Sequence, residues 1–302
     1  MGQTTTASPT AGNWISIFAL GLIWGGTFMV VAIALEGYGP LTVACARTTL
    51  GAVSLLILMQ IMGRPWPSGL RTWGYILVIG VLTTALPFTL LSWGQQYVPS
   101  AFAGLSMAAL PLFVLPLAHV FSDERLEARK ATGVMIGFVG ALILLGPGAL
   151  NFAAGSNALA QLACLGASLS YAVASVLTRR CPPVDSIAMA ALTLVVGAVC
   201  LIPATLAFEG VPGWIEGRAG YAILFLGLIP TAFAALLRVH TIRTAGSVFM
   251  TLVNYQVPVW SMIFGAWILS ETLPLRFFAA LTLILTGLAV SQWSGLRTLV
   301  RR

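Results

Sequence analysis

The sequence predicts an all-α integral membrane protein in which ten transmembrane helices form two inverted five-helix repeats. Hydrophobic residues fill 59% of the 302 positions and charged residues only 8%, with a mean hydropathy of +0.97. A soluble domain carries about 25% charged residues, so the solvent for most of this surface must be lipid. Residues 100–111 and 247–258 repeat one another, and most basic residues gather on alternate loops.

Long apolar segments account for most of the chain, and a helix needs roughly 20 such residues to cross a bilayer. The ten segments cover residues 13–34, 41–62, 73–96, 101–121, 131–146, 157–178, 186–207, 221–241, 248–269 and 277–294. They are rich in Leu, Ala and Gly and lack the alternation of barrel strands. Because lipid offers the backbone no hydrogen bonds, we expect every segment to be helical.

The two halves of the chain match without a gap at an offset of 147 residues, which separates Ser100 from Ser247. The same offset lays Gly80 on Gly227, Thr84-Ala85 on Thr231-Ala232, Glu124 on Glu271 and Gly140 on Gly287, and an offset of 146 lays Gly51-Ala52-Val53 on Gly197-Ala198-Val199. Five spans per repeat is an odd number, so the second half must be inverted in the membrane. Inverted repeats with matching prolines are typical of transporters.

Basic residues fix the expected orientation. With a cytoplasmic N-terminus, twelve of the 15 Lys and Arg residues lie on the cytoplasmic side: Arg64, Arg71, Arg125, Arg129, Lys130, Arg179, Arg180, Arg238, Arg243, Arg297, Arg301 and Arg302. Only Arg218 and Arg276 lie on the opposite side, and Arg47 is within a span. This bias predicts a multi-pass protein of a bacterial-type inner membrane with both termini cytoplasmic. It also explains the net charge of +7 without a nucleic-acid partner.

The expected organisation is a cytoplasmic tail at 1–12, repeat 1 at 13–146, a periplasmic linker at 147–156, repeat 2 at 157–294 and a basic tail at 295–302. Residues 1–12 lack the basic region of a removable signal peptide. The four cysteines have no metal-ligand spacing, and we expect free thiols and neither a metal nor a cofactor. The glycine pairs Gly21/Gly25 and Gly133/Gly137 favour packing within a monomer over dimerisation.

A set of short motifs is spread over nearly the whole chain. They are Trp24-Gly25-Gly26-Thr27-Phe28, Arg47, Ala109-Leu110-Pro111, Ser122-Asp123-Glu124-Arg125-Leu126, Gly133, Gly137, Gly140, Arg179-Arg180, Val257-Pro258 and Ser270-Glu271-Thr272-Leu273. In their order and spacing these motifs resemble the drug/metabolite transporter superfamily in its ten-helix, EamA-like branch. Within the branch the chain looks most like YddG-type exporters of aromatic amino acids. The resemblance implies a central cavity between the halves, lined by spans 1, 3, 4, 6, 8 and 9.

The sequence contains eight acidic residues, and none falls inside a predicted span. Small multidrug antiporters exchange protons for cations through a carboxylate in the membrane, so this chain lacks their device. His119 and His240 lie near the cytoplasmic ends of spans 4 and 8 and are candidates for proton coupling. An interfacial histidine bonded to backbone or water is the favoured interpretation of each, and we expect uniport.

Seven residues are candidates for substrate binding: Trp24, Phe28, Tyr171, Phe233, Asn254, Tyr255 and Gln256. The aromatic side chains would stack on a flat apolar group, although packing or lipid contact is the favoured explanation for any single one. The polar cluster at 254–256 would bond an amino or carboxyl group, or join spans together; the first repeat has Met107, Ala108 and Ala109 there. Arg47 is either a substrate anchor or bonded to carbonyls of a neighbouring helix, and the second interpretation is favoured.

Pro111 and Pro258 occupy matching positions in the middle of spans 4 and 9. Proline removes a helical hydrogen bond and bends or loosens the helix, so these residues are candidate hinges of opposed halves.

The leading hypothesis is therefore an exporter of small amphipathic metabolites, aromatic or neutral amino acids, that works by alternating access. A permease for a sugar-linked or nucleoside-like solute is the alternative. A lipid-handling membrane enzyme is a remote one, because no HExxH motif or paired carboxylates suggest catalytic residues.

Overall fold

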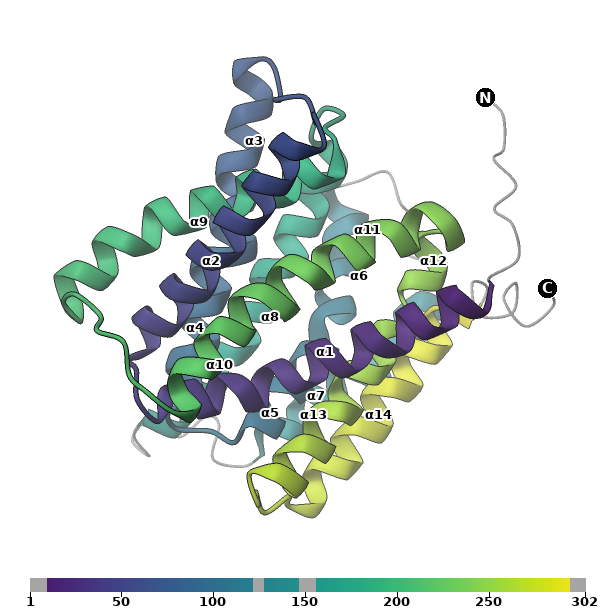
Figure 1. The fold of residues 1–302 in the computed structure, drawn as a ribbon. Helices are drawn as coiled ribbons and strands as arrows, with labels where there is room; N and C mark the ends of the chain where they lie inside the picture. The colour runs from purple at the N-terminus through teal and green to yellow at the C-terminus, as the bar shows by residue number, and fades with distance from the viewer. Residues whose placement is uncertain (1–9, 122–127, 147–155, 294–302) are drawn as a thin grey trace, which may run out of the picture.

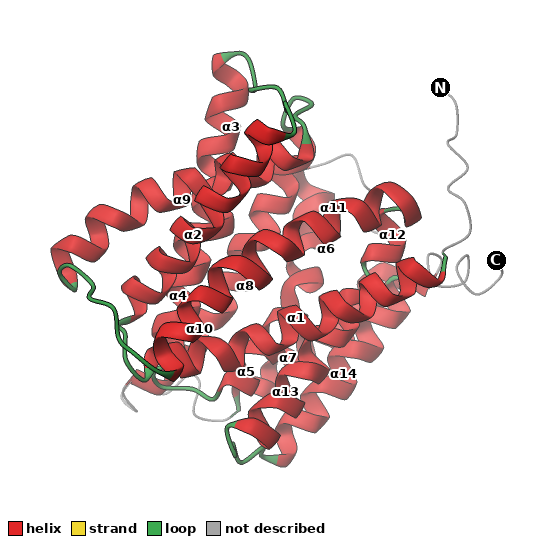
Figure 2. Cartoon of the chain, viewed as in Figure 1, coloured by secondary structure: helices red, strands yellow, loops and turns green. Residues whose placement is uncertain are grey.

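The computed structural model describes residues 10–121, 128–146 and 156–293 of the chain. Within these ranges every residue lies in a helix or in a loop between helices, and there is no strand (Figure 2). The all-helical prediction is therefore confirmed. The motif at 122–126 and nearly all of the expected linker and tails lie outside the described residues.

The helices follow the predicted spans closely. They are α1 (Ala11–Leu35), α2 (Pro40–Ile61), α3 (Leu70–Gly80), η1 (Val81–Ala85), α4 (Leu86–Gly94), α5 (Ser100–Ser106), η2 (Met107–Ala109), α6 (Leu110–Phe121), α7 (Ala128–Leu145), α8 (Ser156–Arg180), α9 (Ser186–Phe208), α10 (Arg218–Leu226), η4 (Gly227–Phe233), α11 (Ala234–Ala245), α12 (Ser247–Met250), α13 (Val253–Ile268) and α14 (Leu275–Ser291). In the described part, eight helical segments are long and apolar enough to cross a membrane.

The last two predicted spans are shorter as continuous helices. A turn at Thr251 and Leu252 separates α12 from α13, which has 16 residues, and α14 has 17. Three other spans contain a change of helix type: η1 joins α3 to α4, η2 joins α5 to α6, and η4 joins α10 to α11. The two longest π-helical segments, η1 and η4, occupy matching positions in the repeats.

The contacts between helices follow the inverted repeat; Figure 1 shows the ribbon with the helices labelled. The most extensive contacts pair α7 with α14 and α2 with α9, which are each other's repeat counterparts. The contact of α1 with α13 has its counterpart in that of α8 with α6. The largest hydrophobic cluster lies where α1, α5, α8 and α13 meet, and includes Leu20, Phe102, Ala167 and Val253.

Glycines allow the repeat-related helices to approach closely. A Cβ on Gly133 of α7 would collide with the carbonyl oxygen of Gly287 in α14, and one on Gly140 would lie 3.0 Å from the carbonyl oxygen of Ala280. The offset of 147 converts Gly133 into Ala280 and Gly140 into Gly287, so the two contacts are symmetry mates. Small residues at helix contacts in lipid give this close van der Waals packing.

The same symmetry relates α2 to η4 and α9 to η1. Thr231 of η4 packs on Gly51 of α2, and Thr84 of η1 packs on Gly197 of α9. These are the residues that the two sequence offsets pair with one another. The sequence repeat is therefore also a repeat of contacts.

One end of the bundle, here called the arginine end, holds an ion cluster. The Asp185 carboxylate caps the start of α9 and lies 3.6 Å from Arg64 Nη1 and 3.4 Å from Arg243 Nη2. Arg64 follows α2 and Arg243 belongs to α11, so the cluster joins three segments. Nearby, Asn13 Nδ2 of α1 donates a hydrogen bond to Thr244 Oγ1 at 2.7 Å.

At the other end, here called the glutamate end, carboxylates cap helices of the opposite repeat. Glu209, at the end of α9, accepts hydrogen bonds from the N–H groups of Leu41 and Thr42 at 2.9 and 2.8 Å. Glu271, which follows α13, accepts them from Ser100 and Ala101 at 2.7 and 3.0 Å. The first N–H groups of a helix have no partner within it, so these carboxylates bind α2 and α5 to the other half.

We expect Gly287→Ala to lower the free energy of unfolding by about 1–3 kcal/mol, because its Cβ would lie 2.6 Å from the Gly137 backbone nitrogen. The measurement is denaturation in detergent micelles. Gly74→Ala in α3 is the control, since no atom lies within 4 Å of its Cβ position. Equal stability of the two variants would contradict the close contact of α7 with α14.

Candidate functional site

Arg47 lies buried in the interior of the bundle, with 6% of its surface exposed. Its Nη2 donates a hydrogen bond to Thr231 Oγ1 at 3.4 Å, and its Cζ lies 3.9 Å from the centre of the Phe88 ring. Its Nε has no hydrogen-bond partner. Among the described residues no carboxylate pairs with it. A cation so placed is expensive in a membrane, and such residues mark functional sites.

The π-helix η4 explains why Thr231 can meet Arg47. Pro230 has no N–H to donate to the Leu226 carbonyl, and the Thr231 hydroxyl donates to that carbonyl instead, at 2.7 Å. The lone pairs of the same hydroxyl then accept from Arg47. The Pro230 carbonyl accepts a hydrogen bond from Trp24 Nε1 at 3.2 Å. Interruptions of this kind often occur at functional sites.

Trp24 and Tyr171 approach this region from α1 and α8. The two residues are related by the repeat offset of 147 and are both half-buried. The Tyr171 hydroxyl lies within electrostatic range of the Arg47 guanidinium. Arg47, Phe88, Thr231, Trp24 and Tyr171 thus come from five different spans of both halves, and we call them the Arg47 cluster.

The Arg47 cluster breaks the symmetry of the repeat. The offset of 146 that pairs Gly51 with Gly197 pairs Arg47 with Thr193. In the second half the corresponding contact is neutral, because the Thr84 hydroxyl donates to the carbonyls of Gly80 and Thr193 at 2.6 and 3.4 Å. A positive charge therefore stands on only one side of an otherwise repeated arrangement.

The remaining predicted binding residues lie elsewhere. Phe28 is buried beside Gly104, where α1 meets α5. Gln256 Nε2 donates to the Ile17 carbonyl at 3.5 Å and its side chain covers Gly21 of α1, so it joins α13 to α1. Asn254 is half-buried, the buried Tyr255 hydroxyl has no hydrogen-bond partner, and Phe233 is 49% exposed.

The structure also gives the positions of the two predicted hinge prolines and of the two histidines. Pro111 is the second residue of α6, which directly follows η2, whereas Pro258 lies inside α13, beyond the turn at Thr251. Both prolines are buried. His119 on α6 and His240 on α11 are exposed, and both lie toward the arginine end.

Sequence reasoning gave Arg47 a mainly structural role and missed Phe88 and Thr231. The sequence carried one signal for Arg47 and one for Thr231, and none for Phe88. Arg47 is the only basic residue near the middle of a predicted span, and Pro230-Thr231 supplies the donor that a proline lacks. Neither signal tells which spans meet, because that depends on packing.

Comparison with known proteins identifies the fold. The model of the EamA-like transporter family matches residues 13–146 and 158–292. The chain belongs to this family. Relatives include the uncharacterized transporter YoaV of Bacillus subtilis, 26% identical over 93% of this chain and 96% of its own, and the uncharacterized inner membrane transporter YedA of Escherichia coli, 29% identical over 85% and 83%.

Two further similarities bear on fold and naming. A probable terminal-alkyne amino-acid exporter of Streptantibioticus cattleyicolor is 24% identical over 83% of each chain. A crystal structure superposes with a TM-score of 0.67 at 20% identity, covering 95% of this chain and 99% of that one, and supports the fold alone. The EamA-like protein described here is a multi-pass membrane transporter, and its relatives are named as transporters.

We expect Thr231→Val to lower the free energy of unfolding by about 1–3 kcal/mol, because it leaves the Leu226 carbonyl and the Arg47 guanidinium without their hydroxyl partner. Thr84→Val is the matched control, since this repeat counterpart meets no cation. Denaturation of both variants in detergent gives the comparison. A larger loss in Thr84→Val would contradict the role of Thr231 at Arg47.

Proposed function

We propose that this protein exports small amphipathic metabolites, aromatic or other neutral amino acids, by alternating access between its inverted halves. The observation that carries the proposal is the buried Arg47 guanidinium, which has no carboxylate partner among the described residues. The similarity to a probable amino-acid exporter and the resemblance to YddG-type exporters favour the same class of solute.

The Arg47 cluster offers the groups that such a solute requires. A free carboxylate would pair with the guanidinium and neutralise a charge that the chain leaves uncompensated. Trp24 and Tyr171, one from each half, supply aromatic surface for a flat apolar side chain. A site shared between the halves is also where a substrate must sit if each half opens in turn.

The proposed movement centres on spans 4 and 9. At the glutamate end these spans are held together by the bonds from Ser100 and Ala101 to Glu271, and by close packing of Gly104 on Ser261. Opening this end must break those contacts. Pro111 and Pro258 are the proposed hinges, because each lacks the N–H that would stiffen its helix.

The proposed orientation puts the arginine end in the cytoplasm, following the positive-inside rule, and both termini with it. The proposed membrane is a bacterial inner membrane, since the relative YedA is named as an inner membrane transporter. His119 and His240 are exposed near the arginine end, away from the Arg47 cluster. We therefore favour uniport over proton coupling through either histidine.

Proteoliposomes test the substrate class. We expect uptake of L-phenylalanine, and a fall in its kcat/KM of about tenfold or more in Arg47→Gln, because a charge-assisted bond to the carboxylate is lost. Arg218→Gln, which removes an exposed arginine from the glutamate end, is the control. Phenylethylamine lacks the carboxylate, so the substitution should not lower its transport. Uptake of a sugar or nucleoside with no amino acid would refute the proposal in favour of the alternative permease.

The hinge proposal predicts that Pro111→Ala and Pro258→Ala slow transport several-fold while leaving folding intact, because each restores a helical hydrogen bond that stiffens its span. Pro203→Ala provides a control in α9, where the proline also lies inside a helix but has no matching partner. Initial rates in proteoliposomes and melting curves are compared. Wild-type rates in both hinge variants would rule out the hinges.

A further inference from the structure

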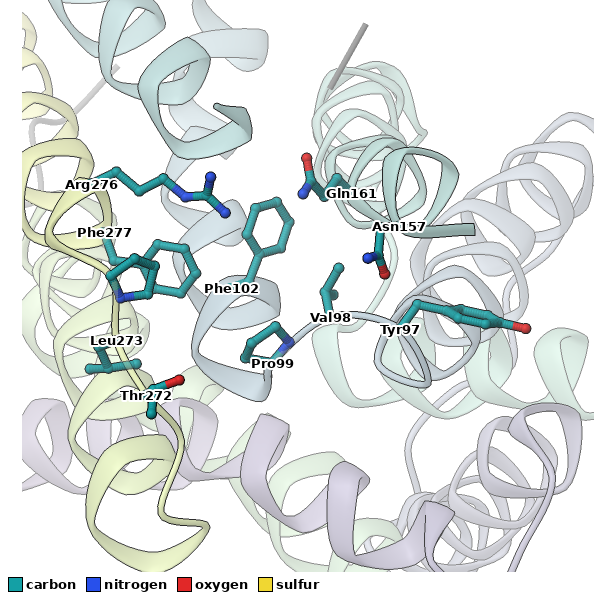
Figure 3. A pocket seen from close by; sticks show the side chains of 11 residues that line it. Tyr97, Val98, Pro99, Phe102, Asn157, Gln161, Thr272, Leu273, Arg276 and Phe277 are labelled. Atoms are coloured by element: carbon teal, nitrogen blue, oxygen red, sulfur yellow. The ribbon is translucent and has the colours of Figure 1, made fainter. Parts of the chain in front are cut away.

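A pocket opens at the glutamate end, apart from the Arg47 cluster (Figure 3). Its volume is about 470 Å³, within the range of sites that enclose small molecules. Segments of both repeats line it: the start of α5, the first turns of α8 and the start of α14. A pocket shared by the two halves changes shape when the halves move.

We call the pocket at the glutamate end the outer pocket. Its base is aromatic. Phe102 of α5 and Phe277 of α14 are 1% and 2% exposed, and their ring centres lie 6.0 Å apart at an interplanar angle of 55°. The two rings pack against each other in the tilted geometry that aromatic side chains prefer, and they form a closely packed apolar base beneath the pocket. The base therefore suits an apolar side chain.

The rim is polar and positively charged. In Figure 3 the Arg276 side chain extends over the pocket toward Gln161 on the opposite wall. Gly146 backs the guanidinium: its φ is +71°, and a Cβ there would lie 2.6 Å from Arg276 Nη1. No described acidic residue pairs with Arg276, and the buried Gln161 Oε1 has no hydrogen-bond partner. The rim thus presents a cation that, among the described side chains, meets only the Phe277 ring, with its Cζ 5.9 Å from the ring centre, and an amide acceptor without a hydrogen-bond partner.

The repeat explains why there is a pocket at this place. The offset of 147 pairs Gln161 with Trp14 and Phe102 with Phe249. At the arginine end the Trp14 ring packs edge-on against Phe249, with ring centres 4.9 Å apart. At the glutamate end the smaller Gln161 replaces that ring. The space that an aromatic side chain fills in one repeat is open in the other.

From these observations we propose that the outer pocket is a second binding site for an α-amino acid with a planar apolar side chain. Arg276 binds the carboxylate, Gln161 Oε1 accepts from the ammonium group, and the side chain lies on the apolar base that Phe102 and Phe277 form. The choice of ligand rests on the proposed function, but the site itself rests on the pocket.

The site also adjoins the contact that must break on opening. The Glu271 carboxylate accepts hydrogen bonds from the N–H groups of Ser100 and Ala101. The pocket is lined by Val98 and Pro99, which directly precede those two residues, and by Thr272, which directly follows Glu271. A solute in the outer pocket therefore touches both segments that the Glu271 carboxylate joins. The pocket is then a binding site that a substrate occupies on the outer side of the Glu271 contact.

Equilibrium binding of radiolabelled L-phenylalanine to the purified full-length protein tests the site. It measures both the number of ligand molecules bound per protein, here called equivalents, and the affinity of each. We expect two equivalents in the wild type. Arg276→Gln should weaken one of them about tenfold or more, since it removes the charge that binds the carboxylate. Gln161→Trp, which restores the side chain found in the other repeat, should abolish the same equivalent by filling the pocket.

Arg218→Gln is the matched control, since this exposed arginine lies at the same end outside the pocket, and both equivalents should remain. Arg47→Gln should remove the central equivalent and leave the outer one. Loss of transport with an intact outer equivalent would therefore separate failure of the proposed function from failure of this inference. A wild type with no bound equivalent that Arg276→Gln and Gln161→Trp weaken, or undiminished outer binding in either folded pocket variant, would overturn the inference, whereas a single equivalent that is sensitive to these two variants and insensitive to Arg47→Gln would overturn only the central site.

Discussion

Lipid supplies no hydrogen-bond partners, so the backbone groups of this bundle must find theirs within the chain. Groups inside a helix bond to one another, and the free N–H groups at the starts of α2 and α5 are satisfied from a different span. Glu209 and Glu271 satisfy the first N–H groups of α2 and α5, each in the other repeat. Thr231 replaces the donor that Pro230 lacks. The same bonds that complete the backbone therefore hold the halves together.

The inverted repeat turns one set of close contacts into two. Gly133 on Gly287 has its mate in Gly140 on Ala280, and the threonine–glycine contacts of η4 and η1 are related in the same way. Backbone atoms form much of these contacts, so they are insensitive to side-chain identity except for the need to be small. The scaffold can thus stay symmetric while the residues facing the interior diverge.

Much of the fold was predictable from the sequence, since apolar length alone placed ten spans and the helices begin and end within a few residues of them. The turn at Thr251 and Leu252 was not, because no glycine or proline marks it. Helix phase was also weak in spans that are apolar all round. Gln256 accordingly proved to join α13 to α1, and the partners of Arg47 came from spans that the sequence could not bring together.

Departures from the repeat are more informative than the repeat itself. Symmetric contacts stabilise the states open to either side equally. They hold the scaffold together, and they do not by themselves distinguish one solute from another. Arg47 stands opposite Thr193, and Gln161 opposite Trp14, and each difference leaves a polar group without a partner in the chain. A buried, unpaired polar group destabilises the empty protein and is relieved by a ligand that pairs with it. Pairing with the carboxylate and ammonium groups of the proposed solute would relieve both, which is why the two proposed sites lie at these two departures from the repeat.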